Sequence, residues 1–174
     1  MLSYRYYLKF FSGFVIISII NELLKTKIVL LNFWMPDLYI IYLVYNAMLI
    51  GNPLGTFEGI FIGFFQDIFS PAFFGFNIIF KGILGSIIGG LKFKIEITGN
   101  WYIGLIYFFV ILFNDFLIFF IKHLTNFKLI FSLIYQRTLP VAISSFFVGM
   151  ALNYIFDKIF SSEVKDIIDG IEKN

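Results

Sequence analysis

The stretch LGTFEGIFIGFFQD, from Leu54 to Asp67, decides how this chain folds. Gly55, Gly59, Gly63 and Asp67 recur at every fourth position among mostly apolar residues. On a helix this spacing places three glycines and one carboxylate in a single narrow stripe. Glycine disfavours a helix in water by about 1 kcal/mol relative to alanine, whereas in lipid a stripe of small residues lets two helix backbones approach closely. The stretch therefore predicts a membrane helix that packs tightly against a neighbour.

The composition of the whole chain also indicates a membrane protein. The 174 residues are 60% hydrophobic and 14% charged, with a mean hydropathy of +0.91, whereas about a quarter of the residues of a soluble domain are charged. A helix needs about 20 residues to cross a bilayer, which leaves room for about six crossings and no separate soluble domain. We predict an all-α polytopic membrane protein with about six transmembrane helices.

Turn and loop signals divide the chain into these spans. Gly51-Asn52-Pro53 separates the second from the third, and Pro36 marks the start of the second. Residues 28–35 leave two alternatives open, an interfacial segment or the first half of a span that Pro36 kinks, and the proline favours a helix that begins near itself. The predicted spans are about 8–24, 36–50, 54–70, 74–91, 101–121 and 133–156, in one membrane domain over residues 1–160, and residues 161–174 form a polar cytoplasmic tail.

The basic residues predict the orientation. Cytoplasmic loops of membrane proteins carry more Lys and Arg than the loops on the other side. With six spans, seven basic residues lie on the side of both termini and four on the opposite side, so both termini are predicted to be cytoplasmic. The seven are Arg5, Lys9, Lys92, Lys94, Lys158, Lys165 and Lys173, and the four are Lys25, Lys27, Lys122 and Lys128.

Ionisable residues in the spans are candidate functional residues, because a bare charge in lipid costs about 3 kcal/mol. In a hairpin that turns near Ala72, Asp67 lies level with Asn77 and about one helical turn from Lys81, so the three can form a polar cluster that fixes the hairpin. Asp67 has a second interpretation, solvation at the interface. If Asp67 anchors the turn, we expect asparagine to replace it tolerably. The ionisable residues are Glu22, Asp37, Glu58, Asp67, Lys81, Asp115 and Arg137.

The residue types of the chain disfavour an enzyme. It has no cysteine and a single histidine, His123, so thiolate and histidine-cluster metal sites are excluded. Ser86 follows Gly85, but His123 is predicted on the opposite side of the bilayer. The net charge of +2 is spread over loops and gives no nucleic-acid-binding patch. We expect no catalytic residue, no cofactor, no metal and no nucleic-acid partner.

The order of the motifs from Pro36 to Leu91 resembles the rod shape-determining membrane protein MreD family. In that family a Pro-Asp-Leu sequence opens a span, a glycine-rich span ends in Gly-Leu-x-x-Asp, and Leu-Gly or Phe-Gly starts the following helix. This chain departs from the family at Phe65-Gln66, where a Leu-Leu pair is common. The matching residues are Pro36-Asp37-Leu38, Gly55, Gly59, Gly63-Phe64-Phe65-Gln66-Asp67, Ser70 and Phe74-Gly75.

The resemblance implies a non-enzymatic scaffold in the bacterial cytoplasmic membrane, within the elongation (rod) complex that builds lateral peptidoglycan. MreC is the first implied partner, RodA, a penicillin-binding transpeptidase and MreB belong to the same complex, and membrane lipid surrounds the chain. The resemblance also implies a fold similar to the S-component of energy-coupling-factor transporters. The residues expected to serve helix packing or partner binding are Pro36, Asp37, Gly55, Gly59, Gly63, Asp67, Gly75, Asn77 and Lys81, and Asp115 and Arg137 are further intramembrane polar residues.

That similarity of fold supplies an alternative function, the substrate-binding (S) subunit of an energy-coupling-factor vitamin transporter. Such a subunit would need an outer pocket lined by aromatic and a few polar groups, and an Ala-x-x-x-Ala coupling surface on the cytoplasmic side. The alanines, at Ala47, Ala72, Ala142 and Ala151, supply no such pair. The glycine-rich hairpin therefore favours the scaffold.

Overall fold

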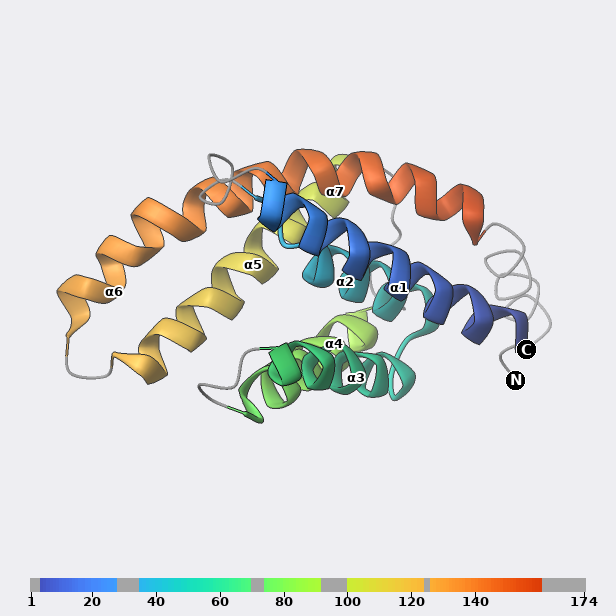
Figure 1. Ribbon diagram of the computed structural model, residues 1–174, viewed down its shortest axis with the longest axis horizontal. Coiled ribbons are helices and arrows are strands. Elements are labelled where there is room, and N and C mark those ends of the chain that lie inside the picture. The colour runs from blue at the N-terminus through green and yellow to red at the C-terminus, as the bar shows by residue number, and fades with distance from the viewer. Residues whose placement is uncertain (1–3, 28–34, 70–73, 92–99, 124–125, 161–174) are drawn as a thin grey trace.

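The computed structural model describes residues 4–27, 35–69, 74–91, 100–123 and 126–160, and these residues are helical apart from short turns. Because α6, the π-helix η3 and α7 follow one another without a break, they form one long helix, shown in orange to red in Figure 1. The elements are α1 (Tyr4–Lys27), α2 (Leu38–Ile50), α3 (Leu54–Phe69), α4 (Phe76–Leu91), α5 (Asn100–Lys122), α6 (Phe127–Leu133), η3 (Ile134–Thr138) and α7 (Leu139–Ile159).

The all-α prediction is confirmed for the described residues. Three segments, Tyr4–Leu24, Trp101–Lys122 and Phe127–Ile159, are long and apolar enough to cross a membrane, and α2 and α4 are apolar but shorter. The last helix begins at Phe127, before residue 133, where the sixth span is predicted to begin. Asn126 causes this earlier start, since its side chain accepts a hydrogen bond from Leu129 N at 3.1 Å and caps the helix.

The start of α2 follows from Pro36 and Asp37. The Oδ1 atom of Asp37 accepts a hydrogen bond from Ile40 N at 3.0 Å, as an N-cap residue does. The Asp37 N–H donates to the Ser145 hydroxyl at 3.1 Å, which joins the start of α2 to α7. The expected helix start near Pro36 is therefore confirmed. Residues 28–34, which carry most of the two alternatives, and the tail 161–174 lie outside the described residues.

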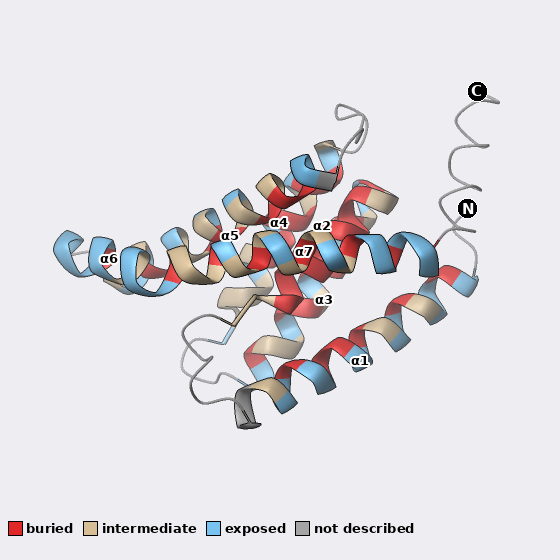
Figure 2. Ribbon diagram, turned by 90° about the horizontal axis from the view of Figure 1, so that it is seen from above, coloured by how far each residue is buried: buried red, intermediate tan, exposed pale blue. Residues whose placement is uncertain are grey.

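The centre of the molecule is α2. Every residue from Leu38 to Met48 is buried, and the helix packs against α1, α3, α4, α5 and α7. A helix that is apolar around its whole circumference belongs in the interior. Figure 2 shows the buried residues concentrated on α2 and on the faces of its neighbours that turn toward it, while α6 and the far end of α5 extend away from this core.

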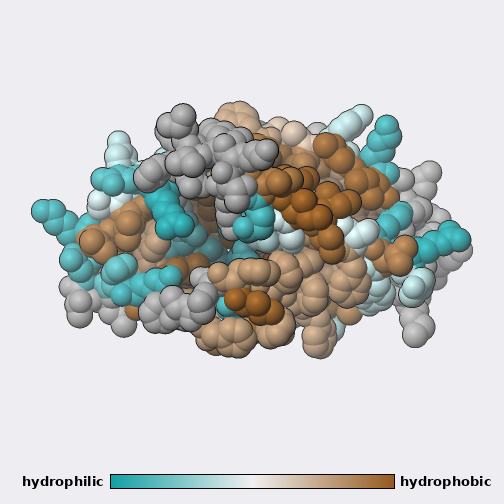
Figure 3. Space-filling model, viewed as in Figure 1, coloured by the Kyte–Doolittle hydropathy of each residue, from teal (hydrophilic) through white to brown (hydrophobic). Residues whose placement is uncertain are grey.

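The start of α1 and the end of α7 come together at one end of the molecule (Figure 1). The Lys9 ammonium donates to the carbonyl of Ile159 at 2.9 Å, and the ring centroids of Tyr6 and Phe160 are 5.8 Å apart. In Figure 3 the more hydrophobic residues cover the middle of the face, and hydrophilic residues gather mainly toward the two ends. Many large apolar side chains on the outside of the helices are exposed, among them Ile16 on α1 at 56%. An apolar exterior suits a surface that faces lipid.

Candidate functional site

The glycine stripe brings the backbone of α3 into contact with that of α4. An ideal Cβ atom on any of its three glycines would collide with a backbone carbonyl of α4, and at Gly55 this distance is 2.9 Å. Each step of four residues along α3 is matched by a step of four back along α4, so the helices run antiparallel at close range. The pairs are Gly55 with Gly85, Gly59 with Lys81, and Gly63 with Asn77.

The glycines of α4 form two rows, Gly85 with Gly89 and Gly82 with Gly90, and only the first row packs against backbone atoms. A Cβ atom on Gly85 would collide with the carbonyl of Gly55, and one on Gly89 would lie 2.9 Å from Asn52 N. The second row behaves differently, because a Cβ atom on Gly82 would meet the side chain of Ile60, and one on Gly90 would meet nothing within 4 Å. Gly90 is therefore a matched control position for the packing glycines.

Asp67 ends the stripe by capping the start of α4. It is 1% exposed. Its Oδ2 atom accepts from the backbone N–H groups of Gly75 at 2.9 Å and Ile78 at 3.2 Å. Its Oδ1 atom accepts from the backbone N–H of Asn77 at 3.2 Å and from the Asn77 side-chain amide at 2.8 Å. A carboxylate here satisfies N–H groups that lack partners within the helix and interacts favourably with the helix dipole. Of the two interpretations of Asp67, the structure shows the buried polar contact.

Both oxygens of Asp67 accept two hydrogen bonds, so the structure leads us to expect that asparagine is a poorer replacement than the sequence alone indicates. An asparagine amide carries one acceptor oxygen and one NH₂ donor group. The NH₂ group would face two part-buried N–H donors, and both of these hydrogen bonds would be lost.

The turn before α4 needs glycine at position 75. Gly75 has a φ of +97°, in the left-handed region that side chains with a Cβ atom disfavour. Its N–H donates to Asp67 in this conformation. Gly75, the glycine of the Phe-Gly pair in the sequence motif, is thus both the turn residue and a hydrogen-bond donor to Asp67.

Lys81 does not join the Asp67 cluster. It lies one turn further along α4, and among the described residues its ammonium has no hydrogen bond or ion pair to Asp67. Its side chain is 1% exposed, and it lines a cavity. The predicted cluster is therefore reduced to Asp67 and Asn77, and Lys81 belongs to a second site.

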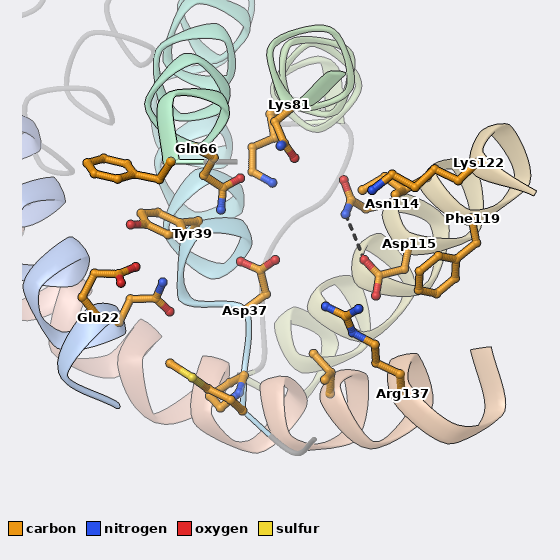
Figure 4. Close-up of a pocket in the computed structure, with 17 residues that line it drawn as sticks. Glu22, Asp37, Tyr39, Gln66, Lys81, Asn114, Asp115, Phe119, Lys122 and Arg137 are labelled. Carbon is orange, nitrogen blue, oxygen red and sulfur yellow. Dashed lines mark hydrogen bonds between the residues drawn. The ribbon is translucent and has the colours of Figure 1, made fainter. Parts of the chain in front are cut away.

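A cavity of about 740 Å³ lies where the end of α1, the start of α2, the end of α3 and the start of α4 meet α5, η3 and α7 (Figure 4). Pockets for small molecules have volumes of about 300 to 1,000 Å³. Apolar side chains such as Phe119 and Val141 form part of the wall. Five of the ionisable candidates from the sequence, which lie far apart along the chain, meet here with Asn77. The charged lining residues are Glu22, Asp37, Lys81, Asp115, Lys122 and Arg137.

The carboxylate of Asp115 is held by two neighbours. It accepts from the Asn114 amide at 3.1 Å and from the Thr138 hydroxyl at 3.0 Å. Thr138 is buried and belongs to η3, the π-helical segment inside the long last helix, and π-segments often occur at functional sites. The preceding residue, Arg137, is exposed and lines the same cavity.

Sequence reasoning passed over two lining residues. Gln66 entered only as a departure from the family motif, and Asn114, the residue before Asp115, was not among the candidates. The Gln66 Oε1 and Asn114 Oδ1 atoms are buried and accept no hydrogen bond within the described part of the chain. The signal in the sequence was that each of these polar residues lies directly beside a candidate aspartate. Because a helix turns about 100° per residue, such a residue faces a different part of the structure from the aspartate.

A second buried polar group joins α1, α2 and α3 near the termini. The Tyr6 phenol oxygen lies 2.8 Å from Glu58 Oε1 and 3.0 Å from Asn46 Oδ1. All three residues are buried. The sequence named Glu58 but gave no sign of its partners, since Tyr6 is 52 residues away.

Comparisons of the chain with protein-family models, with curated proteins and with solved structures found no match. In the described ranges, no group of three or more His, Asp or Glu side chains could hold a metal ion. The cavity offers carboxylates, cations and amides, which suit the binding of a polar molecule.

Proposed function

We propose that the chain is a non-enzymatic scaffold of the bacterial cell-elongation complex, which supports lateral peptidoglycan synthesis through MreC and the wall synthases. The α3–α4 hairpin carries this proposal. The residues that resemble the MreD family are the same residues that pack the two backbones and cap α4 with Asp67. Contact between backbones leaves few alternative packings, and a scaffold needs such a fixed surface.

The proposed place of the chain is the bacterial cytoplasmic membrane, with several crossings and both termini in the cytoplasm. The apolar helices and the excess of basic residues on the side of the termini support it. The contact between Lys9 and Ile159, which keeps the described ends of the chain together, also supports it. MreC is the proposed direct partner, and RodA, the transpeptidase and MreB are proposed members of the same complex.

The test is recovery of MreC from the same organism with the affinity-tagged full chain out of native membranes. We expect the parent and Gly90→Leu to recover MreC, since no atom lies within 4 Å of the added Cβ at Gly90. Gly59→Leu should lose it, because the side chain would force α3 away from Lys81 on α4. A folded parent that recovers no MreC, or turnover of a lipid-linked wall precursor by the purified chain alone, would refute the proposal.

The cavity favours a second candidate, the substrate-binding subunit of an energy-coupling-factor vitamin transporter. Its volume of about 740 Å³ and its polar lining suit a small molecule. A vitamin found by mass spectrometry in the purified chain, together with recovery of a transport ATPase in place of MreC, would support this candidate over the scaffold.

A further inference from the structure

Lys81 is a buried cation without a counter-charge in bonding distance. Its side chain is 1% exposed and lines the cavity, and the structure shows no ion pair or hydrogen bond of its ammonium within the described ranges. Taking a charge out of water is costly unless it is paired and hydrogen-bonded. Gly59 fixes this position, because the carbonyl of Lys81 is the atom against which Gly59 packs. The cavity therefore presents one inward cation that an anionic group can pair with.

Three acceptor oxygens from three other helices line the same cavity. Gln66 Oε1 and Asn114 Oδ1 are buried and unpartnered among the described residues, and Asn114 is 2% exposed. Asp37 uses Oδ1 as its cap to Ile40, and no bond to its Oδ2 is found in the described segments. In Figure 4 the side chains of Gln66, Asp37 and Asn114 surround the space into which Lys81 extends.

The other charged lining residues do not change this pattern. Asp115 already accepts two hydrogen bonds. Glu22, Lys122 and Arg137 are exposed, and Glu22 and Lys122 have further contacts of their own. The lining holds three acidic and three basic residues and is neutral as a whole. A ligand that carries both an anion and a cation suits such a lining better than one with a net charge.

We propose that this cavity binds the ammonium–phosphate zwitterion of a phosphoethanolamine group, with the phosphate on Lys81 and the primary ammonium on Asp37, Gln66 and Asn114. A primary ammonium has three N–H donors, which equals the number of open acceptor oxygens. Lysine binds phosphate as a point charge. The quaternary ammonium of a choline group has no N–H donor, so the site discriminates between the two headgroups.

Two sources supply this chemistry, a membrane aminophospholipid and a free headgroup. The apolar wall beside the charges can accommodate the glycerol and the first acyl carbons of a lipid, and Phe69 at the cavity is 70% exposed. The experiment compares phosphatidylethanolamine with phosphatidylcholine of identical acyl chains. A second arm compares glycerophosphoethanolamine with glycerophosphocholine. Binding to the lipid-depleted full chain in detergent is measured by native mass spectrometry and by the shift of the thermal midpoint.

Two variants each remove one of the two charges that would bind the headgroup, and a third variant is the control for the loss of a lysine. Asp37→Asn removes the carboxylate charge but keeps an oxygen for the N–H of Ile40. Lys81→Met keeps the length of the side chain and removes the ammonium. Lys158→Met makes the same change at an exposed position that does not line the cavity.

The parent should bind the ethanolamine probe at least tenfold more tightly than the choline probe. Asp37→Asn should lose this preference, Lys81→Met should weaken binding of both probes at least tenfold, and Lys158→Met should match the parent. Preference in the lipid arm alone identifies the lipid as the source, and equal preference in both arms identifies the headgroup. Equal binding of ethanolamine and choline probes, or an unchanged preference in Asp37→Asn, overturns the proposal.

If Lys81→Met does not fold, the Asp37→Asn variant decides the outcome, because it retains the cap of α2. Recovery of MreC is a separate readout. A parent chain that binds MreC but shows no headgroup preference refutes this site alone, and a parent chain that shows the preference but recovers no MreC refutes the scaffold alone.

Discussion

Replacing Gly59 with alanine perturbs the α3–α4 contact by a single methyl group. The new Cβ atom would collide with the carbonyl of Lys81 and lie 3.1 Å from Gly82 N. Both neighbours are backbone atoms inside α4, so no rotation of a side chain can relieve the collision. The two helices must separate, and separation would also strain the hydrogen bonds by which Asp67 caps α4.

The expected loss of stability is about 2 kcal/mol. Overpacking of a well-packed interior costs about 1 to 3 kcal/mol, and a collision with backbone belongs at the upper end of this range. Alanine regains about 1 kcal/mol over glycine through its helix propensity. The net loss corresponds to a change of about 30-fold in the ratio of folded to unfolded chain.

The assay is denaturant-induced unfolding of the purified full chain in detergent, with Gly90→Ala as the matched control. A Cβ atom on Gly90 meets nothing within 4 Å, so this variant should be as stable as the parent or gain up to about 1 kcal/mol. If Gly59→Ala proved as stable as Gly90→Ala, α3 and α4 could not be in backbone contact, and the packing argument would be refuted.

Four further variants at three positions test other contacts by the same unfolding assay. Asp67→Asn should cost about 1 to 3 kcal/mol and Asp67→Ala at least as much, because buried N–H donors lose their acceptor; a fully stable asparagine variant would show that one oxygen suffices. Gly75→Ala should cost about 1 to 2 kcal/mol because φ is +97°, and an unchanged midpoint would mean that the turn adopts another conformation. Tyr6→Phe should cost about 1 to 3 kcal/mol by removing the donor to Glu58, and a neutral result would argue against this buried bond.

The hairpin was the part of the fold most accessible from sequence. The period of four in Gly55, Gly59 and Gly63 predicts one face of a helix, and the short turn before α4 predicts an antiparallel neighbour. The pairing of Asp67 with Asn77 also follows from spacing, since both lie near the turn and levels on a helix are fixed at about 1.5 Å per residue. Both predictions depend only on residues that lie close together in the sequence.

The cavity could not be assembled from sequence in the same way. Its lining comes from seven helical elements, and which faces of α1, α5 and η3 turn toward α2 depends on packing between segments distant in the chain. The role of Lys81 shows the limit clearly. Spacing put it within reach of Asp67, but a turn of the helix directs it into the cavity instead. The π-segment that places Thr138 against Asp115 was not predicted from the sequence.

The most direct test of the backbone-packed hairpin is disulfide formation between α3 and α4 in native membranes. The chain has no cysteine, so introduced pairs report without background. A Cβ atom on Gly82 would lie 3.0 Å from the side chain of Ile60, and disulfides join Cβ atoms about 3.8 Å apart. The Ile60→Cys/Gly82→Cys variant should cross-link within one chain on mild oxidation. Ile60→Cys/Gly90→Cys should not, because Gly90 lies about 12 Å further along α4. Absence of the first cross-link, or equal cross-linking of both pairs, would contradict the close contact of α3 and α4.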